Sequence, residues 1–353
     1  MKAVMLCAGR GTRLRPLTYS LVKHLIPIAN QPVVHFGLEN IAAVGIREVG
    51  LIVSPESRTV IEEAIGDGSR WGMRTHYIEQ SAPLGLAHAC QCAETFVDGD
   101  SFIMYLGDNL IPEGLAEPVE RFRRGADAVV MLKEVDDPRA FGIAVLDGDR
   151  VVRLVEKPKD PPSNLAIVGG YVFSPEIFTS IRRIRPSWRN ELEITDAIQD
   201  LIDRGLRVRS YVMGSYWKDT GSPQDILEAN RVMLERLTPD SQGNVDTASR
   251  IEGTVVIGVG AEIRNSTVIG PTIIGDGARI EGSVIGPHAS VGDRARIRNS
   301  RIDNCVLMED TEVIDLDRRL TESLVGRKVR VSGGDAGTVR LILGDASEVT
   351  IGG

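Results

Sequence analysis

The sequence predicts an α/β domain followed by a β-helix, and three features of the chain support this. Up to about Leu237, apolar runs typical of buried strands alternate with longer amphipathic stretches typical of helices. A polar stretch with Pro and Gly follows, which indicates a linker. From Ile251 the isoleucines recur in a hexapeptide period, which is typical of a β-helix. We therefore expect a domain at 1–237, a linker at 238–250 and a second domain at 251–353.

The first domain is expected to contain a mostly parallel sheet covered by helices on both faces. Its continuous apolar runs lack the alternation of a half-exposed strand, and strands of this kind are buried on both sides. They lie at 3–6, 49–53, 101–106 and 128–132. Helices are expected at 57–65, 85–95 and 194–203. A last helix should begin after Ser222-Pro223, where Ser can cap and Pro fits the first turn.

The second domain shows its period most clearly at its beginning. Ile251, Ile257, Ile263 and Ile269 follow each other at a spacing of six, and glycines occupy many of the turns between later isoleucines. One coil of a β-helix cannot bury its own apolar edge, so successive coils stack. An ordinary β-sandwich is the alternative. The period fails after Ile314, where a terminal cap is expected.

Composition and charge exclude several classes of protein. The chain has 353 residues with 41 Lys+Arg and 49 Asp+Glu, a formal charge of -8, which argues against a strongly basic nucleic-acid or membrane-surface protein. Four scattered cysteines are too few for a disulfide scaffold. No segment approaches the ~20 apolar residues of a membrane span. We expect reduced thiols and a cytoplasmic location.

The segment 9–18 after the first strand run is a candidate phosphate-binding loop. Gly9 and Gly11 allow backbone N–H groups to approach an anion, while Thr12 and Arg13 add a hydroxyl and a forked cation. Leu14 stands where a Rossmann fingerprint has its third Gly, and no Gly-Lys-Ser/Thr of a Walker A loop occurs. A purely structural Gly-rich turn is the alternative.

Further motifs accompany this loop in a fixed order. They are Lys23-His24-Leu25-Ile26-Pro27-Ile28, Leu106-Gly107-Asp108-Asn109, Glu156-Lys157-Pro158, Glu191-Leu192-Glu193-Ile194-Thr195-Asp196 and Trp217-Lys218-Asp219-Thr220-Gly221. Together they resemble the signature of the sugar-1-phosphate nucleotidylyltransferase family, and with the hexapeptide tail the chain is most similar to its long thymidylyl-transferring members. The resemblance implies a Rossmann-like nucleotidyltransferase domain followed by a left-handed β-helix.

The same resemblance implies a reaction. A thymidylyl group would pass from dTTP to glucose 1-phosphate, giving dTDP-glucose and pyrophosphate, the first step of dTDP-deoxysugar biosynthesis such as that of rhamnose. The attacking phosphate oxygen is already anionic, so no general base is required. Catalysis should rest on positioning and charge neutralisation. The implied catalytic residues are Arg13, Lys23 and Lys157.

Two aspartates are the expected metal ligands. Asp108 lies at the end of an apolar strand run and Asp219 follows another strand-like run. Two converging carboxylates suit Mg²⁺, which takes one or two carboxylates together with waters and substrate phosphates. The alternatives are a turn residue at Asp108 and a helix N-cap at Asp219; the resemblance favours the Mg²⁺ site.

The resemblance also assigns substrate contacts. Nucleotide binding is expected at Gly9, Gly11, Thr12, Arg13, Lys23, His24, Gln80, Gly85 and Asp108. Sugar binding is expected at Asn109, Gly142, Glu156, Lys157, Ile167, Tyr171 and Arg189. Lys23 would lie over the α-phosphate, Gln80 would pair with the pyrimidine edge, and Lys157 would anchor the sugar phosphate. A surface lysine, a loop entering a helix and a charged turn are the respective alternatives.

Two residues depart from the family pattern, and other functions remain open. His24 stands where Gln is common and Asn190 where Gly is common. The enzyme could use UTP or another sugar phosphate, or the chain could be a catalytically silent regulatory subunit. An acyltransferase with His288 as base is a third reading, although His288 follows a Gly-Pro turn and is expected at an exposed corner. Expected partners are the two small substrates, no nucleic acid or membrane, and further copies of the chain joined through the β-helix, as in a trimer.

Overall fold

The computed structural model describes residues 1–334 and 337–352, which form two compact units. The first comprises Met1–Gly9 and Val33–Asp219, and the second comprises Arg10–Pro32 and Thr220–Gly353. The segment Arg10–Pro32 thus packs with the β-helix rather than with the sheet that precedes it in sequence. Among the described residues, every helix is too short or too polar to span a bilayer.

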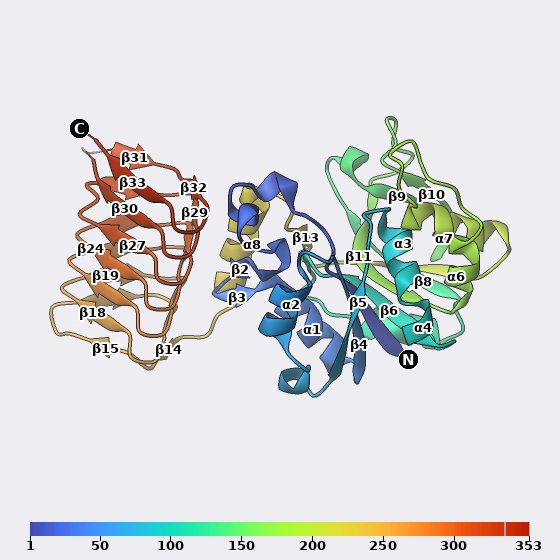
Figure 1. The fold of residues 1–353 in the computed structure, drawn as a ribbon, viewed down its shortest axis with the longest axis horizontal. Coiled ribbons are helices and arrows are strands. Elements are labelled where there is room, and N and C mark those ends of the chain that lie inside the picture. The colour runs from blue at the N-terminus through green and yellow to red at the C-terminus, as the bar shows by residue number, and fades with distance from the viewer. Residues whose placement is uncertain (335–336, 353) are drawn as a thin grey trace. The chain divides into compact units, whose positions relative to one another are not determined.

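The first unit is built on a nine-stranded mixed sheet (Figure 1). In spatial order its strands are β5 (Arg74–Glu79), β4 (Glu48–Val53), β1 (Lys2–Leu6), β6 (Phe102–Leu106), β11 (Leu165–Phe173), β8 (Ala128–Glu134), β12 (Val208–Val212), β10 (Arg150–Glu156) and β9 (Gly142–Asp147). β1 is parallel to β4 and β6, but β11 is antiparallel to both β6 and β8. The sheet is therefore less parallel than expected, because β11 is apolar along its length and such a run carries no information on strand direction.

In the part of the chain that the structure describes, seven α-helices accompany the sheet, and an eighth lies in the second unit. They are α1 (Val33–Ala43), α2 (Arg58–Ile65), α3 (Leu86–Cys92), α4 (Glu94–Val97), α5 (Ala116–Arg123), α6 (Glu176–Ile181), α7 (Ile194–Asp203) and α8 (Pro223–Leu234). The four predicted helices are confirmed, with the stretch 85–95 divided between α3 and α4. Ser222 caps α8 by accepting a hydrogen bond from Asp225 N at 3.3 Å, with Pro223 in the first turn.

Successive side chains of each strand point to opposite faces of the sheet. Val4 and Leu6 of β1 belong to a buried cluster with α3, α6 and α7. Met5 points to the other face, where a Cβ on Gly37 of α1 would lie 2.8 Å from Met5 Cε. Gly37 therefore lets α1 approach the sheet closely. The strand ends are fixed between these two helical layers.

Short elements complete the chain outside the large sheets. The 3₁₀ turns are η1 (Thr12–Leu14), η2 (Leu17–Tyr19), η3 (Lys23–Leu25), η4 (Ser69–Trp71) and η5 (Pro138–Ala140). The two-stranded pairs are β2 (Pro27–Ile28) with β3 (Gln31–Pro32), and β7 (Asn109–Leu110) with β13 (Lys218–Asp219).

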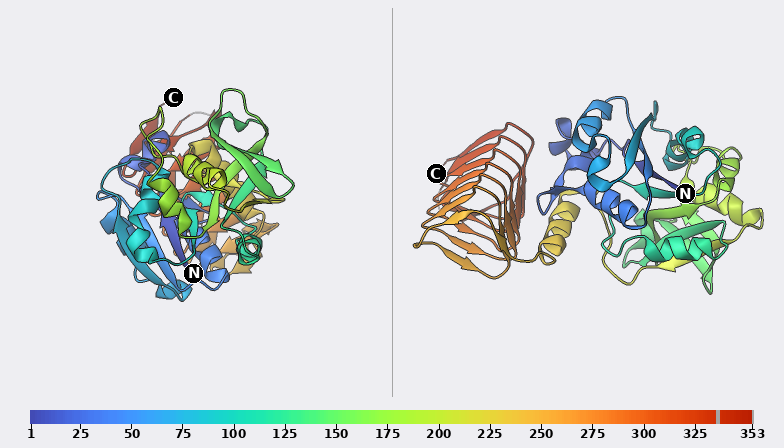
Figure 2. Two further views of the ribbon diagram at one scale, coloured as in Figure 1. Left: turned by 90° about the vertical axis from the view of Figure 1, so that its right-hand side faces the viewer. Right: turned by 90° about the horizontal axis from the view of Figure 1, so that it is seen from below.

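The β-helix of the second unit has three parallel sheets, and its coils stack on one another (Figure 2). The β14 sheet contains β14 (Asp240–Ser241), β17 (Val255–Ile257), β20 (Thr272–Ile274), β23 (Ala289–Val291), β26 (Cys305–Leu307), β29 (Ser323–Val325) and β32 (Ile342–Leu343). The β15 sheet contains β15 (Asn244–Val245), β18 (Glu262–Arg264), β21 (Arg279–Glu281), β24 (Arg296–Arg298), β27 (Glu312–Ile314), β30 (Arg330–Gly333) and β33 (Glu348–Ile351). The β16 sheet contains β16 (Arg250–Glu252), β19 (Thr267–Ile269), β22 (Val284–Ile285), β25 (Arg301–Ile302), β28 (Arg318–Leu320) and β31 (Gly337–Val339).

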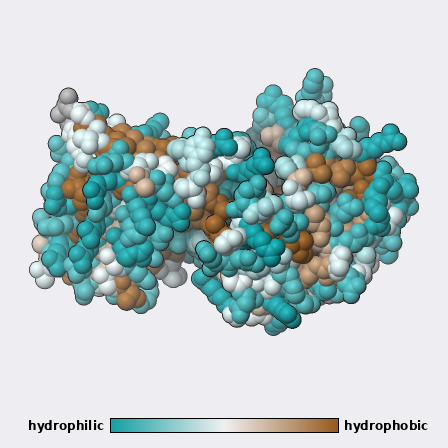
Figure 3. Space-filling model, in the orientation of Figure 1, coloured by the Kyte–Doolittle hydropathy of each residue, from teal (hydrophilic) through white to brown (hydrophobic). Residues whose placement is uncertain are grey.

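The structure thus shows the predicted left-handed β-helix, with two differences from the sequence analysis. The expected linker 238–250 contains β14 and β15, which pair with β17 and β18. Loss of the period after Ile314 does not end the coils, because β28 to β33 continue the same three sheets. The interior remains apolar there, with Val325 and Val331 buried in the same cluster as Ile263. Figure 3 shows the visible outer face of this unit as mainly hydrophilic.

A ladder of serines pairs the backbone N–H groups at one corner of the β-helix. Ser266 N donates to Ser249 Oγ at 3.1 Å, Ser283 N to Ser266 Oγ at 3.1 Å, and Ser300 N to Ser283 Oγ at 3.2 Å. Leu316 N donates to Ser300 Oγ at 3.2 Å. Each hydroxyl therefore accepts a backbone hydrogen bond from the next coil, which removes the cost of burying an unpaired N–H group.

Candidate functional site

Two chain segments leave the first sheet at the same edge. β1 and β6 are parallel neighbours with Leu6 opposite Leu106, and Gly107 N donates to Leu6 O at 3.0 Å. Gly9 follows β1, and Asp108 follows β6. The register therefore places the beginning of the glycine-rich loop and Asp108 at the carboxyl ends of adjacent strands, where ligands of α/β proteins bind.

Asp219 reaches this edge through a short strand pair. β13 is antiparallel to β7 with Asp219 opposite Asn109, the residue that follows Asp108. Asn109 Nδ2 donates to Asp108 Oδ1 at 3.0 Å. The structure thus brings the two predicted ligands, Asp108 and Asp219, into adjacent backbone positions.

This donor set fits a hard divalent cation. Within residues 1–334 and 337–352, no cluster of three or more His, Cys, Asp or Glu side chains could hold a metal. An ion such as Mg²⁺ needs only one or two carboxylates when phosphate oxygens and water complete its coordination. Two carboxylates at the sheet edge are suited to a metal that arrives with a polyphosphate.

Asn109 is a fixed part of this edge. Its side chain is 2% exposed, and its Oδ1 accepts hydrogen bonds from Trp217 Nε1 at 2.7 Å and from Gly169 N at 3.3 Å. Trp217 in turn packs edge-on against Phe141, with the ring centroids 5.3 Å apart. The amide is engaged with protein atoms on both sides, so Asn109 rigidifies the wall that carries Asp108.

A second group of predicted residues meets where β9, β10 and α7 come together. Gly142 pairs with Glu156 across β9 and β10. A Cβ on Gly142 would lie 2.6 Å from Thr195 Cγ2 and 3.1 Å from both Glu156 Oε2 and Ile167 Cδ1. Only glycine leaves this space open, and Glu156 Oε2 accepts a hydrogen bond from Thr195 Oγ1 at 3.1 Å.

Charges around Glu156 are balanced by two cations. Lys157 Nζ and Arg189 Nη1 each lie 3.6 Å from Glu156 Oε1. Arg189 also contacts Glu193 at 3.4 Å and Glu191 at 3.1 Å. Burial raises the pKa of the Glu156 carboxyl, with Lys157 and Arg189 opposing the effect and Glu193 adding to it. Glu156 is therefore a carboxylate paired with the half-buried ammonium of Lys157 and with the guanidinium of Arg189.

Tyr171 closes the inner side of this region. Its side chain is buried, its ring stacks on Phe173 at 5.5 Å, and burial together with the nearby Glu156 charge raises the pKa of its hydroxyl. Tyr171 and Ile167 thus form an apolar wall of the kind that lies against the carbon face of a small ligand.

Gln80 and Gly85 form a separate group in front of α3. Gln80 Nε2 donates to Gly85 O at 3.3 Å and lies 3.0 Å from His88 Nδ1. A backbone carbonyl can only accept, so this contact fixes which end of the amide is the nitrogen. Gly85 has φ +103°, and a Cβ there would lie 2.8 Å from Leu192 N. The tight approach to the 191–196 segment therefore requires glycine.

The basic residues of the loop lie in the second unit. Gly11 has φ +63°, and a Cβ on it would lie 2.9 Å from Lys23 Cβ. Thr18 Oγ1 donates to Gly11 O at 2.7 Å and closes the loop. A Cβ on Gly221 would lie 2.8 Å from the guanidinium carbon of Arg13. Thr12 begins η1, and His24, in η3, is buried.

Two known protein families match this chain. The profile of the family described as "Nucleotidyl transferase" matches residues 2–236. This chain belongs to the nucleotidyl transferase family. A second profile, "GlmU-like, C-terminal hexapeptide", matches residues 236–324. Members of the nucleotidyl transferase family generally use a divalent metal.

Two curated relatives of this nucleotidyl transferase match over nearly its full length, and a solved structure matches over two thirds of it. It is 48% identical to glucose-1-phosphate thymidylyltransferase of Streptomyces antibioticus, over 99% of each chain. It is 46% identical to the protein of the same name from Streptomyces griseus, again over 99% of each. A solved structure assigned as a glucose-1-phosphate thymidylyltransferase from Bacillus anthracis, in complex with sucrose, matches with a TM-score of 0.62 at 32% identity, covering 66% of this chain and 94% of that one.

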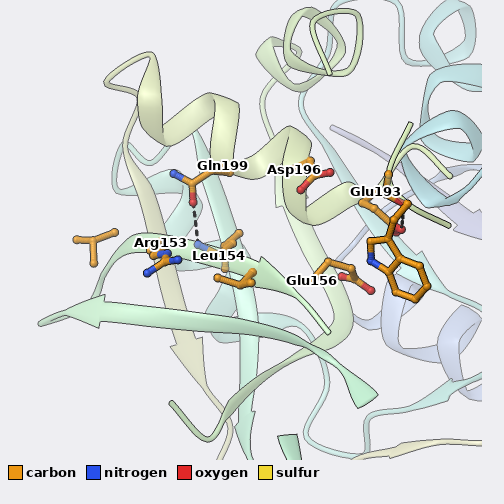
Figure 4. A pocket seen from close by; sticks show the side chains of 10 residues that line it. Arg153, Leu154, Glu156, Glu193, Asp196 and Gln199 are labelled. Atoms are coloured by element: carbon orange, nitrogen blue, oxygen red, sulfur yellow. Dashed lines mark hydrogen bonds between the residues drawn. The ribbon is translucent and has the colours of Figure 1, made fainter. Parts of the chain in front are cut away.

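The nucleotidyl transferase unit also contains a pocket that the sequence analysis did not describe. It has a volume of about 560 Å³ and lies between β10 and the beginning of α7. Figure 4 shows Glu156, Glu193 and Asp196 together at one end of it. Trp188, 85% exposed, also lines it. Glu193 and Thr195 were within a recognised motif but had no role assigned; their contacts with Arg189 and Glu156 show that this motif orders the pocket.

His288 lies at a corner of the β-helix in this nucleotidyl transferase. It follows Gly286-Pro287, has φ +60°, and its Nε2 is 3.4 Å from Glu235 Oε1. The histidine is thus engaged with a carboxylate just beyond α8. His288 therefore lies at a corner as expected, but its side chain is partly buried rather than exposed.

Proposed function

We propose that the chain transfers the thymidylyl group of dTTP to glucose 1-phosphate, giving dTDP-glucose and pyrophosphate, at the first step of dTDP-deoxysugar biosynthesis. The observation that carries the proposal is the pair of carboxylates, Asp108 and Asp219, at the strand edge of a chain that matches thymidylyltransferases over 99% of its length. The pocket around Glu156 supports a small polar substrate such as a hexose phosphate.

The proposed chemistry is an in-line displacement. A phosphate oxygen of glucose 1-phosphate forms a bond to the α-phosphorus of dTTP, and the bond between this phosphorus and the bridging oxygen of the leaving pyrophosphate breaks. Arg13 and Lys23 stabilise the negative charge on the phosphates. Asp108 and Asp219 would hold Mg²⁺, which when bound supplies further charge neutralisation. No proton needs to be removed from the nucleophile.

Base selection is assigned to Gln80. Because its Nε2 is held by Gly85 O and His88 Nδ1, its Oε1 is the end that would accept a hydrogen bond from N3–H of thymine. Cytosine has an acceptor at N3, which would face the acceptor Oε1 of Gln80 and leave both without a hydrogen bond. Uracil shares the N3–H group, so UTP is the nearest competing substrate. Gly9, Gly11 and Thr12 would contribute donors to the phosphates, and His24 supports the loop.

Sugar anchoring is assigned to Lys157, with Glu156 accepting hydrogen bonds from sugar hydroxyls. Gly142, Ile167 and Tyr171 would line the sugar, and Arg189 would complete the polar rim. Asn109 is buried and engaged with Trp217 and Gly169, so it would act on the sugar only by holding the wall that carries Asp108. We expect the Lys157→Ala variant to bind glucose 1-phosphate about 10- to 100-fold more weakly, because one charge-assisted phosphate contact is lost. Its affinity for dTTP should stay close to that of the wild type.

Calorimetric titration of each substrate checks this prediction. The control is Lys159→Ala, which removes an exposed lysine two residues away in the same loop and should leave both affinities unchanged. An equal loss of dTTP affinity in Lys157→Ala would contradict the assignment of this lysine to the sugar phosphate.

An activity panel tests the function as a whole. Purified protein with Mg²⁺ is assayed for pyrophosphate release with dTTP, UTP, ATP and GTP against glucose 1-phosphate, galactose 1-phosphate and glucosamine 1-phosphate. We expect the highest kcat/KM with dTTP and glucose 1-phosphate. A higher value with UTP would identify a uridylyltransferase, and no turnover with any pair would identify a silent subunit. We further propose a cytoplasmic homo-oligomer joined through the β-helix, with a trimer as the form to be tested by light scattering.

A further inference from the structure

The β14 sheet carries an apolar ladder on its outer side. The central residues of its strands stack in register, and we call this row the outer ladder. Its members are Val256, Ile273, Ser290, Val306, Leu324 and Ile342. The residues on either side of them, such as Cys305 and Leu307 beside Val306, point into the β-helix core. In the β15 sheet the central residue of each strand points inward instead. In β21, for example, Ile280 is inside and the charged Arg279 and Glu281 are outside.

Part of the outer ladder is covered by the segment that carries Arg13 and Lys23. Val306 and Leu324 are fully buried although they face away from the core of the β-helix. Their cover is a cluster drawn from the loop segment, from α8 and from Met308 next to β26. The covering residues of the loop segment are Leu14, Leu17, Leu21 and Ile26, and those of α8 are Ile226 and Leu227. Figure 1 shows α8 beside the β29 and β32 edge of the coils.

Buried hydrogen bonds fix the same segment to the ladder. Asn230 of α8 is 1% exposed, and its Oδ1 accepts from Ala29 N at 2.8 Å and from Ser290 Oγ at 2.7 Å. Asn30 Nδ2 donates to Val291 O at 2.7 Å. Ala29 and Asn30 both have positive φ, so these bonds hold a turn that the chain would not favour on its own. Apolar and polar contacts thus locate both ends of the segment.

We propose that the outer ladder is a positioning element for Arg13 and Lys23, so that the β-helix sets the geometry of the nucleotidyl transfer reaction. Leu14 follows Arg13 directly, and Ile26 lies three residues after Lys23. The segment itself contains only three single 3₁₀ turns and the two-residue strands β2 and β3, too little structure to place two cations accurately. The inference rests on the proposed function, since it assumes that both cations act on the nucleotide.

The test compares single variants of the full-length protein. Leu324→Ala removes apolar contact under the segment, and Asn30→Gly removes one hydrogen bond while keeping a residue suited to positive φ. We expect kcat to fall at least about tenfold in Leu324→Ala, because small misplacements of catalytic groups have large effects on rate. The affinity for glucose 1-phosphate should not change. Leu324→Met, which keeps the apolar contact, should retain the wild-type kcat. Asn30→Gly should lower kcat by a smaller factor, again without a change in the affinity for glucose 1-phosphate. Its melting temperature should be unaltered.

The control is Ile297→Ala, which removes an inward residue of the β15 sheet that belongs to the β-helix core and not to the covered cluster. It should keep the wild-type kcat. Wild-type kcat in both Leu324→Ala and Asn30→Gly would overturn the proposal, as would an equal loss in Ile297→Ala. If Leu324→Ala does not fold, Asn30→Gly decides alone. Turnover by the wild-type protein is measured first, so failure of the proposed function is seen separately, as an inactive parent protein.

Discussion

Replacing Asp108 with asparagine is expected to leave a folded protein that has lost nearly all turnover. The change keeps the size of the side chain and its ability to accept from Asn109 Nδ2, but removes one of the two negative charges proposed to hold Mg²⁺. Removal of the metal with EDTA should abolish activity of the wild type in the same way, and added Mg²⁺ should restore it. Pyrophosphate release and thermal melting are the two measurements.

Asp98→Asn provides the matched control for this variant. Asp98 is exposed and has φ +53°, a conformation that asparagine adopts readily. Its activity should equal that of the wild type. Full activity of Asp108→Asn with an unchanged melting curve would remove Asp108 from the metal site.

Truncating Lys23 to alanine should lower kcat by about 10²- to 10³-fold, the usual effect of losing one preorganised charge donor from a transition state. The alanine retains the Cβ that packs against Gly11, so the loop should keep its shape. The KM for glucose 1-phosphate should rise far less, because the sugar phosphate is assigned to Lys157. Steady-state kinetics with each substrate varied in turn measures both quantities.

Lys23→Arg serves as the companion variant. It retains the positive charge and should recover part of the lost rate, although the forked guanidinium differs from an ammonium in shape. A wild-type kcat in Lys23→Ala would show that this residue is an ordinary surface lysine.

The sequence was sufficient to predict the features that depend on local pattern. Most of the periodic isoleucines become inward residues of the coils, as Ile263, Ile280 and Ile297 show, because their burial lets the coils stack. Two do not: Ile251 is 38% exposed, and in β19 the buried residue is Val268 rather than Ile269. The start of α8 followed from Ser222-Pro223, since capping is decided within one turn of helix. The pairing of Asp108 with Asp219 was expected from motif order, and β7 and β13 supply its physical basis.

Features that depend on long-range partners were not predictable. The apolar run of β11 is compatible with either strand direction, so its antiparallel pairing with β6 was missed. The leucines of Arg10–Pro32 gave no sign that they pack on Val306 and Leu324, which lie about 300 residues away along the chain. The ion pairs of Arg189 with Glu156 and Glu193 likewise join residues whose charges alone do not identify their partners.

The serine ladder couples the opening of neighbouring coils of the β-helix. The amide of Ser283 is protected by the hydroxyl of Ser266, and the hydroxyl of Ser283 protects the amide of Ser300. Opening one coil therefore exposes an amide of the next, and loosening propagates along the stack like the fraying of a one-dimensional chain. Hydrogen exchange in this corner should consequently report the opening of several coils at once. A fluctuation in the first coils of the β-helix, near Ser249, can travel by this route toward the coil of Val306, which lies under the loop of Arg13 and Lys23.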